Sequence, residues 1–188
     1  DEGVIIDLAR IYGATQGWDV DDLLERRGDY GFWDPEYSDP SGKMPGMGTM
    51  DAFRCLVDSR RTKKLVDGIL RTVAQKGSVR ENPLIAIDAG TGTGVLAIAL
   101  VAGGCDYVHA LEINPQTAAA TKRVVQQLDL EDRIGVIECD ATQVQLSGYQ
   151  AQVVVSENLS NGLFDEPQFD IIHPLSQFAV SDATIIPG

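Results

Sequence analysis

From residue 83 onward, short apolar runs alternate with segments of helical character, and this alternation constrains the fold more than any other feature of the sequence. The apolar runs are residues 84–88, 106–113, 133–140, 151–157 and 182–188. The segments with helical spacing between them are residues 94–104, 115–128 and 166–178. Strands separated by helices of this length form a parallel sheet with helices on both faces. The sequence therefore predicts an α/β fold with a doubly wound, mainly parallel sheet over residues 54–188.

The first 53 residues predict an N-terminal helical extension. Residues 3–10 and 19–27 have the pattern of short amphipathic helices, and residues 38–49 are rich in glycine and proline, which favours a loop. This extension could act as a lid over a site on the sheet. Residues 50–76 then predict a long helix that is interrupted near Ser59.

A glycine-rich segment, Asp88-Ala-Gly-Thr-Gly-Thr-Gly94, joins the first predicted strand to the first predicted helix of the sheet domain. An open α/β sheet binds its ligand at this place. Gly90, Gly92 and Gly94 permit a tight turn and a close approach of the ligand to the backbone. The dinucleotide pattern would require glycine at position 95, where Val95 stands. Asp88 instead predicts a carboxylate beside the ligand, which favours a cofactor with a cationic or amine group.

Two further acidic residues follow the next predicted strands. Glu112 stands 22 residues after Gly90, the separation at which a carboxylate can accept both hydroxyl groups of a ribose. Asp140 ends the third predicted strand at the same edge of the sheet and could accept an adenine amino group. An aminoacyl nucleoside without phosphates would fit this set, whereas Asp140 taken alone is better explained as a helix N-cap or a solvated strand end.

The segment from Leu84 to Asp140 resembles the cofactor-binding half of class I S-adenosylmethionine-dependent methyltransferases, through its glycine loop and Glu112. The resemblance implies a Rossmann-like methyltransferase fold and S-adenosyl-L-methionine as the cofactor. It leaves the methyl acceptor open.

The loop after the fourth predicted strand, Ser156–Glu166, resembles the double-glutamate loop of protein arginine methyltransferases. Glu157 and Glu166 have that family's nine-residue separation, and the resemblance implies that both are catalytic. A guanidinium is a poor nucleophile, and two carboxylates can draw its positive charge toward two nitrogens while the third faces the methyl donor. The alternative is that Glu157 caps a turn and Glu166 stabilises the first turn of a helix.

The segment from Leu56 to Thr62 is similar to the helix that precedes the first strand in the same family, and the resemblance implies that Arg61 pairs with the cofactor carboxylate. The sequence also departs from that family. Asn158 stands where the family has tryptophan, and the chain ends at Gly188, where the family's C-terminal barrel would begin. The expectation is therefore a cofactor-binding domain over residues 54–188 that lacks a C-terminal substrate domain.

The charge distribution limits the partners. The chain has 28 acidic and 15 basic side chains, a net charge of −13, and no lysine or arginine after Arg133. This balance argues against nucleic acid and favours a basic protein or a guanidino or amine small molecule as substrate. A homodimer is a further expectation from the family resemblance.

The cysteines indicate where in the cell the protein works and whether it binds a metal ion. Cys55, Cys105 and Cys139 lack metal-binding spacing, so no metal site is expected, and reduced thiols favour the cytoplasm. No apolar run reaches the roughly 18 residues of a membrane helix.

The leading hypothesis is a methyltransferase acting on a guanidino or amine nitrogen. One alternative is a small-molecule or RNA methyltransferase. Another is a catalytically silent S-adenosylmethionine-binding subunit that works with a partner.

Overall fold

A computed structural model of the chain describes residues 2–28, 46–78, 82–146, 150–158 and 168–187. Its strands are β1 (Ile85–Ala89), β2 (Tyr107–Glu112), β3 (Ile134–Glu138), β4 (Ala151–Val155) and β5 (Ala179–Ile186). Its helices are α1 (Glu2–Ala14), α2 (Val20–Glu25), α3 (Thr49–Val57), α4 (Ser59–Gly77), α5 (Val95–Gly103), α6 (Pro115–Gln127) and α7 (Gln168–Leu175). Short 3-10 helices follow α2 and α7, at Arg26–Gly28 and Ser176–Phe178.

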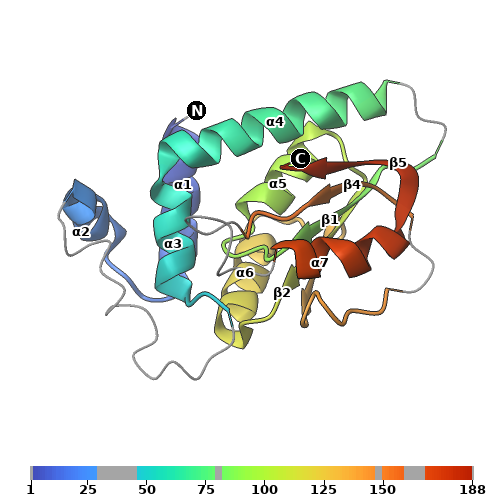
Figure 1. Ribbon diagram of the computed structural model, residues 1–188. Coiled ribbons are helices and arrows are strands. Elements are labelled where there is room, and N and C mark those ends of the chain that lie inside the picture. The colour runs from blue at the N-terminus through green and yellow to red at the C-terminus, as the bar shows by residue number, and fades with distance from the viewer. Residues whose placement is uncertain (1, 29–45, 79–81, 147–149, 159–167, 188) are drawn as a thin grey trace.

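The described strands form one five-stranded sheet in the order β3-β2-β1-β4-β5, and every pair is parallel. The chain moves outward from β1 to β3 and then returns to the other side of β1 to add β4 (Figure 1). In sheets of this type, ligands bind at the carboxyl ends of the strands where the order reverses. The predicted α/β, doubly wound fold is confirmed.

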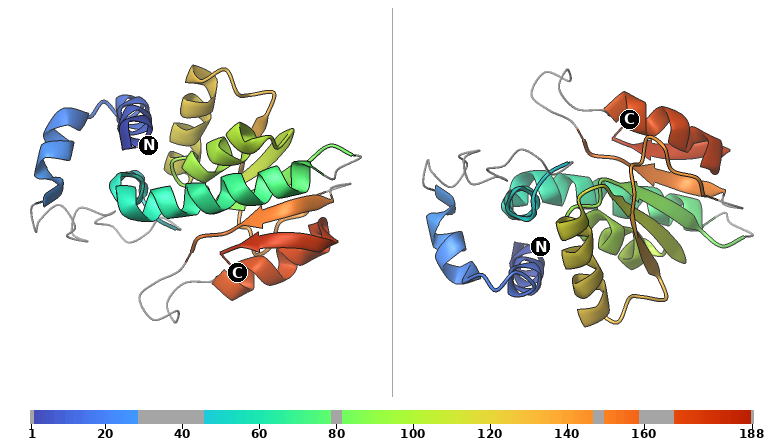
Figure 2. Two further views of the ribbon diagram at one scale, coloured as in Figure 1. Left: turned by 90° about the horizontal axis from the view of Figure 1, so that it is seen from above. Right: turned by 90° about the horizontal axis from the view of Figure 1, so that it is seen from below.

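Alternate residues of the strands face two different helical layers. Ala86 and Val108 pack with α4 and α5, whereas Ile87 and Leu111 pack with α7. Figure 2 shows α7 across the sheet from α5 and α6. Burial on both faces explains why the strands appear in the sequence as continuous apolar runs.

The N-terminal helices attach to the sheet domain through α6. Tyr12, Phe53 and Val124 belong to one buried cluster that joins α1, α3 and α6. Trp18 packs edge-on against Phe53, with ring centroids 5.7 Å apart. The predicted helical extension is thus present, and the expected boundary after residue 53 falls inside α3.

The interruption predicted near Ser59 is confirmed. Helix α3 ends at Val57, and Asp58 begins α4 as its N-cap, because its Oδ1 accepts a hydrogen bond from the backbone N–H of Arg61 at 3.2 Å. The predicted strand at 182–188 is wrong at its start. Strand β5 begins at Ala179, immediately after the 3-10 turn that ends at the buried Phe178.

The part of the chain that the structure describes contains no helix that is both long and apolar enough to cross a lipid bilayer.

Candidate functional site

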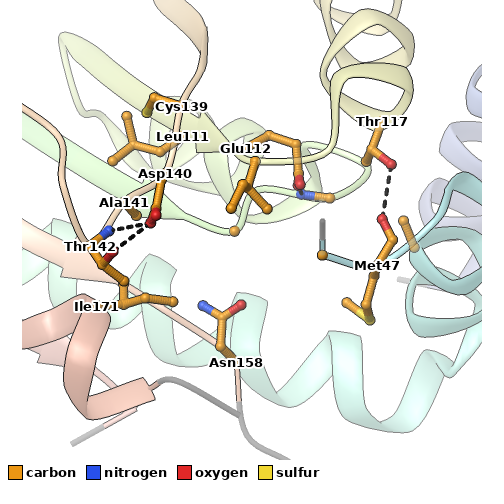
Figure 3. Close-up of a pocket in the computed structure, with 15 residues that line it drawn as sticks. Met47, Leu111, Glu112, Thr117, Cys139, Asp140, Ala141, Thr142, Asn158 and Ile171 are labelled. Atoms are coloured by element: carbon orange, nitrogen blue, oxygen red, sulfur yellow. Dashed lines mark hydrogen bonds between the residues drawn. The ribbon is translucent and has the colours of Figure 1, made fainter. Parts of the chain in front are cut away.

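The main cavity lies at the carboxyl ends of β1, β2 and β3 and has a volume of about 360 Å³. Its wall includes the glycine loop, the end of β2 and the turn after β3, together with Met47 from the segment before α3 and Ile171 from α7. Figure 3 shows these side chains around one hollow. The volume falls within the range of about 300–1,000 Å³ that is usual for small-ligand sites.

The glycine loop lines this cavity with backbone. Gly90, Gly92 and Gly94 have φ values of 76°, 55° and 84°, in the left-handed region that favours glycine. The N–H groups of Gly90 and Thr91 both donate to the Leu111 carbonyl at 2.9 Å, which holds the loop against β2. Gly90 and Gly92 line the cavity, whereas Gly94 begins α5 as its N-cap.

Glu112 at the end of β2 is almost fully buried, with 6% of its surface exposed. One carboxylate oxygen accepts the N–H of Gly92 at 3.0 Å and the other accepts the N–H of Asn114 at 2.9 Å. Burial raises the pKa of Glu112, and the hydrogen bonds from the backbone oppose that rise. A carboxylate has about four acceptor positions, so two remain for ligand hydroxyl groups. The ribose-binding role of Glu112 stays a prediction.

Asp88 takes a different position from the one the sequence suggested. Its side chain is 1% exposed, and it is not among the described residues that line the main cavity. Oδ2 accepts the hydroxyl of Thr91 at 2.7 Å, while the buried Oδ1 has no hydrogen-bond donor in the described part of the chain. Burial raises the pKa of Asp88 to about 6. Asp88 therefore supports the glycine loop from beneath.

Asp140 lines the cavity and also stabilises its own turn. Its Oδ1 accepts the backbone N–H of Thr142 at 2.9 Å and the Thr142 hydroxyl at 2.7 Å, and Oδ2 accepts the side-chain amide of Gln143 at 3.0 Å. These bonds, led by the Thr142 hydroxyl, lower the pKa of Asp140. Asp140 thus closes the turn after β3 rather than capping a helix, and the same carboxylate lines the cavity (Figure 3).

Arg61 and Glu157 meet in a second, smaller cavity that shares Gly90 and Gly92 with the first. Arg61 comes from the first turn of α4 and Glu157 from the segment that follows β4. The guanidinium of Arg61 forms an ion pair with the Glu157 carboxylate, whose side chain is only 13% exposed. The structure thus brings together a residue predicted to bind cofactor and a residue predicted to be catalytic.

Asn158 is a site residue that the sequence pattern did not identify. Its side-chain amide donates to the Ala89 carbonyl at 2.9 Å and to the Ser156 hydroxyl at 3.0 Å, and its backbone N–H donates to the Gln168 side chain at 2.9 Å. A Cβ added to Gly90 would come within 2.5 Å of Asn158 Oδ1. The only sequence signal was the departure from the arginine methyltransferase loop at this position.

Some predicted features lie outside the described residues. These are Glu166 and most of the predicted loop at 38–49. Within the described residues, no group of three or more histidine, cysteine, aspartate or glutamate side chains could hold a metal ion.

Comparison with known proteins places this geometry among methyltransferases. The sequence profile of the ribosomal protein L11 methyltransferase (PrmA) family matches residues 68–179. The chain is 29% identical to protein arginine N-methyltransferase 7 of Danio rerio, over 63% of this chain and 18% of that protein. It is 35% identical to the ribosomal protein L11 methyltransferase of Acinetobacter baylyi, over 52% of this chain and 33% of that protein.

Solved structures show the same fold. The Trypanosoma brucei PRMT1 enzyme-prozyme heterotetrameric complex with AdoHcy matches 70% of this chain and 40% of its own, with a TM-score of 0.62 and 20% identity. Protein arginine methyltransferase 10 of Arabidopsis thaliana matches 68% of this chain and 35% of its own, with a TM-score of 0.59 and 22% identity. The chain thus spans less than half the length of these relatives.

Proposed function

The chain belongs to the ribosomal protein L11 methyltransferase (PrmA) family of class I S-adenosylmethionine-dependent methyltransferases, and we propose on this premise that it transfers a methyl group to a nitrogen acceptor. The predicted class is confirmed by this membership, and S-adenosylmethionine is the cofactor of the class. The predicted likeness to arginine methyltransferases is confirmed by the 29% identity to protein arginine N-methyltransferase 7 of Danio rerio.

The residues present fit this cofactor. Glu112 would accept the ribose hydroxyls, Asp140 the adenine amino group, and the backbone at Gly90 and Gly92 would lie along the aminoacyl part. When bound, the cofactor supplies a methyl group on a sulfonium. Transfer forms one nitrogen–carbon bond, breaks one sulfur–carbon bond and releases a proton from the acceptor nitrogen together with S-adenosylhomocysteine.

We further propose that the acceptor is a guanidino group, of a basic protein or a small molecule. The observation that supports this is the ion pair between Glu157 and the guanidinium of Arg61 beside the glycine loop. A carboxylate that holds one guanidinium in a largely buried position has the charge and geometry to hold another. Glu157 would orient the acceptor and concentrate positive charge on the nitrogens it contacts, which leaves the third nitrogen more nucleophilic.

A second acceptor class has its own support. The matching family profile and the Acinetobacter baylyi relative both carry the name of ribosomal protein L11, which favours an amine of a basic protein. A silent S-adenosylmethionine-binding subunit is the third option, since one structural neighbour is an enzyme-prozyme complex. In each case a second subunit, either another copy or a different chain, could complete the assembly.

The decisive experiment is transfer of label from methyl-labelled S-adenosylmethionine to a cell extract and to free arginine. Glu157→Gln keeps the size of the side chain and removes the charge, so we expect turnover to fall about 100-fold or more, the effect of losing one preorganised electrostatic group. Cofactor affinity should change little. Glu131→Gln, at an exposed position away from the cavities, is the matched control.

Three outcomes separate the options. Label in the guanidino fraction that depends on Glu157 supports the proposal, and label in lysine or amino-terminal nitrogens supports the amine acceptor. Cofactor binding without any transfer indicates the silent subunit.

A further inference from the structure

A third cavity, of about 410 Å³, opens beside Glu157 on the side away from the main cavity. Arg61 and Glu157 line both this cavity and the small cavity over the glycine loop, so the two are neighbours. Any acceptor that reaches Glu157 from this side passes the wall formed by the first turns of α4. The residues on that wall therefore help to determine which acceptors can bind.

The wall is cationic. Arg60 and Lys64 line the cavity and stand four positions apart, on one face of α4. Both are exposed, and neither forms an ion pair with any carboxylate in the described part of the chain. Two carboxylates also line this cavity: Glu157 pairs with Arg61, and Asp58, the N-cap of α4, accepts the backbone N–H of Arg61 through its Oδ1. With three cationic and two carboxylate side chains in its lining, the cavity has a net charge of +1 in a chain whose net charge is −13.

We propose that Arg60 and Lys64 bind a carboxylate that the acceptor molecule carries close to the nitrogen that is methylated. This inference rests on the proposed methyl transfer at Glu157. A guanidinium and an ammonium on adjacent helical turns can share one carboxylate, the guanidinium through two parallel N–H bonds. The neighbouring Glu157 then receives the cationic end of the same molecule.

This arrangement narrows the acceptor class. The acidic chain as a whole attracts cations over long range. At the entrance, Arg60 and Lys64 repel a segment that carries only positive charge. A molecule with a guanidino group and a nearby carboxylate is attracted through its guanidinium and is not repelled at the entrance, because its carboxylate pairs with the two cations. The carboxylate can belong to a free amino acid or to an acidic residue beside an arginine in a protein.

The test compares acceptors that differ only in the carboxylate. Free arginine is compared with argininamide, and the peptide acetyl-Glu-Arg-Glu-amide with acetyl-Gln-Arg-Gln-amide. Binding is measured by calorimetry with S-adenosylhomocysteine present, and methyl transfer by kcat/KM. We expect the carboxylate-bearing member to bind about three- to tenfold more tightly, because both cations are solvent-exposed. The first pair reports on a free amino acid and the second on a protein segment.

The double variant Arg60→Gln/Lys64→Gln should abolish the preference and leave the affinity for S-adenosylhomocysteine unchanged. Lys63→Gln is the matched control, because Lys63 is an exposed cation of the same helix that is not among the described residues lining the cavity. It should retain the preference.

Several results would overturn the inference. They are equal binding within each pair, no binding of any of the four compounds, and a preference that survives in the double variant. Weaker S-adenosylhomocysteine binding in the double variant would also overturn it, since the two cations would then hold the cofactor carboxylate. If the preference is present but no methyl group is transferred, the proposed function fails and the carboxylate site stands.

Discussion

Glu112 connects the glycine loop to the turn after β2. Its removal should weaken cofactor binding and loosen the glycine loop and the turn. The Gly92 and Asn114 N–H groups lose their acceptor in Glu112→Ala, and the ligand loses its partner for the ribose hydroxyls. We expect S-adenosylmethionine affinity to fall by about 1.5–3 kcal/mol, the range for charge-assisted hydrogen bonds. Calorimetry measures this loss. Glu112→Gln should lose less, because one acceptor oxygen remains, and normal binding by Glu112→Ala would remove the ribose assignment.

Asp88 makes the stability of the protein depend on pH. Burial raises its pKa from 3.8 to about 6, so between these values the folded state holds a proton that the unfolded state has lost. The contribution of Asp88 to stability is therefore greatest below pH 4 and decreases as the pH rises to about 6. A shift of this size corresponds to roughly 3 kcal/mol.

The measurement is urea unfolding of wild type and Asp88→Asn at several pH values. Asparagine keeps an acceptor for the Thr91 hydroxyl and does not titrate. The stability of the wild type relative to the variant should fall from pH 4 to pH 6.5 and then level off. A difference that is constant across this range would show that Asp88 keeps an ordinary pKa.

At the scale of elements, the break between α3 and α4 fixes where Arg61 stands. Asp58 caps α4 through the Arg61 N–H, and the Thr62 hydroxyl donates to the Cys55 and Leu56 carbonyls across the break. Asp58→Ala should destabilise the protein by about 1 kcal/mol through loss of the cap. Asp58→Asn should recover most of this loss, since asparagine is an equally good cap. Equal midpoints of urea unfolding for Asp58→Ala and wild type would contradict the capping role.

The elements themselves were largely predictable from the sequence, because local signals set them. Asn114 with Pro115 marks the start of α6, and the glycines at 103 and 104 mark the end of α5. The start of β5 was not predictable in this way. It depends on the packing of Phe178 against the sheet, a tertiary contact that leaves no periodic pattern.

The site was predictable in part for the same reason. Gly90, Gly92 and Glu112 lie at fixed offsets from strand ends, so the fold determines where they meet. The hydrogen bond from the Thr91 hydroxyl to Asp88 could not be predicted, because the position of a residue at a strand end does not show which neighbours its side chain contacts. Asn158 was missed because its side-chain amide is held by the Ala89 carbonyl, which is 69 residues away in the sequence.

At the scale of the whole molecule, three neighbouring cavities lead from Asp140 past the glycine loop to the wall of α4. Gly90 and Gly92 join the first to the second, and Arg61 and Glu157 join the second to the third. An elongated path of this kind would allow cofactor and acceptor to enter from opposite ends. The two ends also differ in charge: the first cavity is lined by the carboxylates of Glu112 and Asp140 and no lysine or arginine of the described residues, whereas the third has three cations against two carboxylates.

The net charge of −13 should make acceptor capture sensitive to salt. Attraction between the acidic molecule and a cationic acceptor acts through solvent, where the screening length falls from about 30 Å at 0.01 M to about 8 Å at 0.15 M ionic strength. Glu112, which we propose contacts the cofactor, is buried, so its interactions are screened much less. Raising sodium chloride from about 10 to 300 mM should therefore raise the KM for argininamide by about tenfold, while the Kd for S-adenosylmethionine changes by about twofold or less. Arginine, which carries one positive charge fewer, should show a smaller rise in KM than argininamide. A KM that is unchanged by salt for both compounds would mean that long-range charge plays no part in capture and would favour a small neutral acceptor.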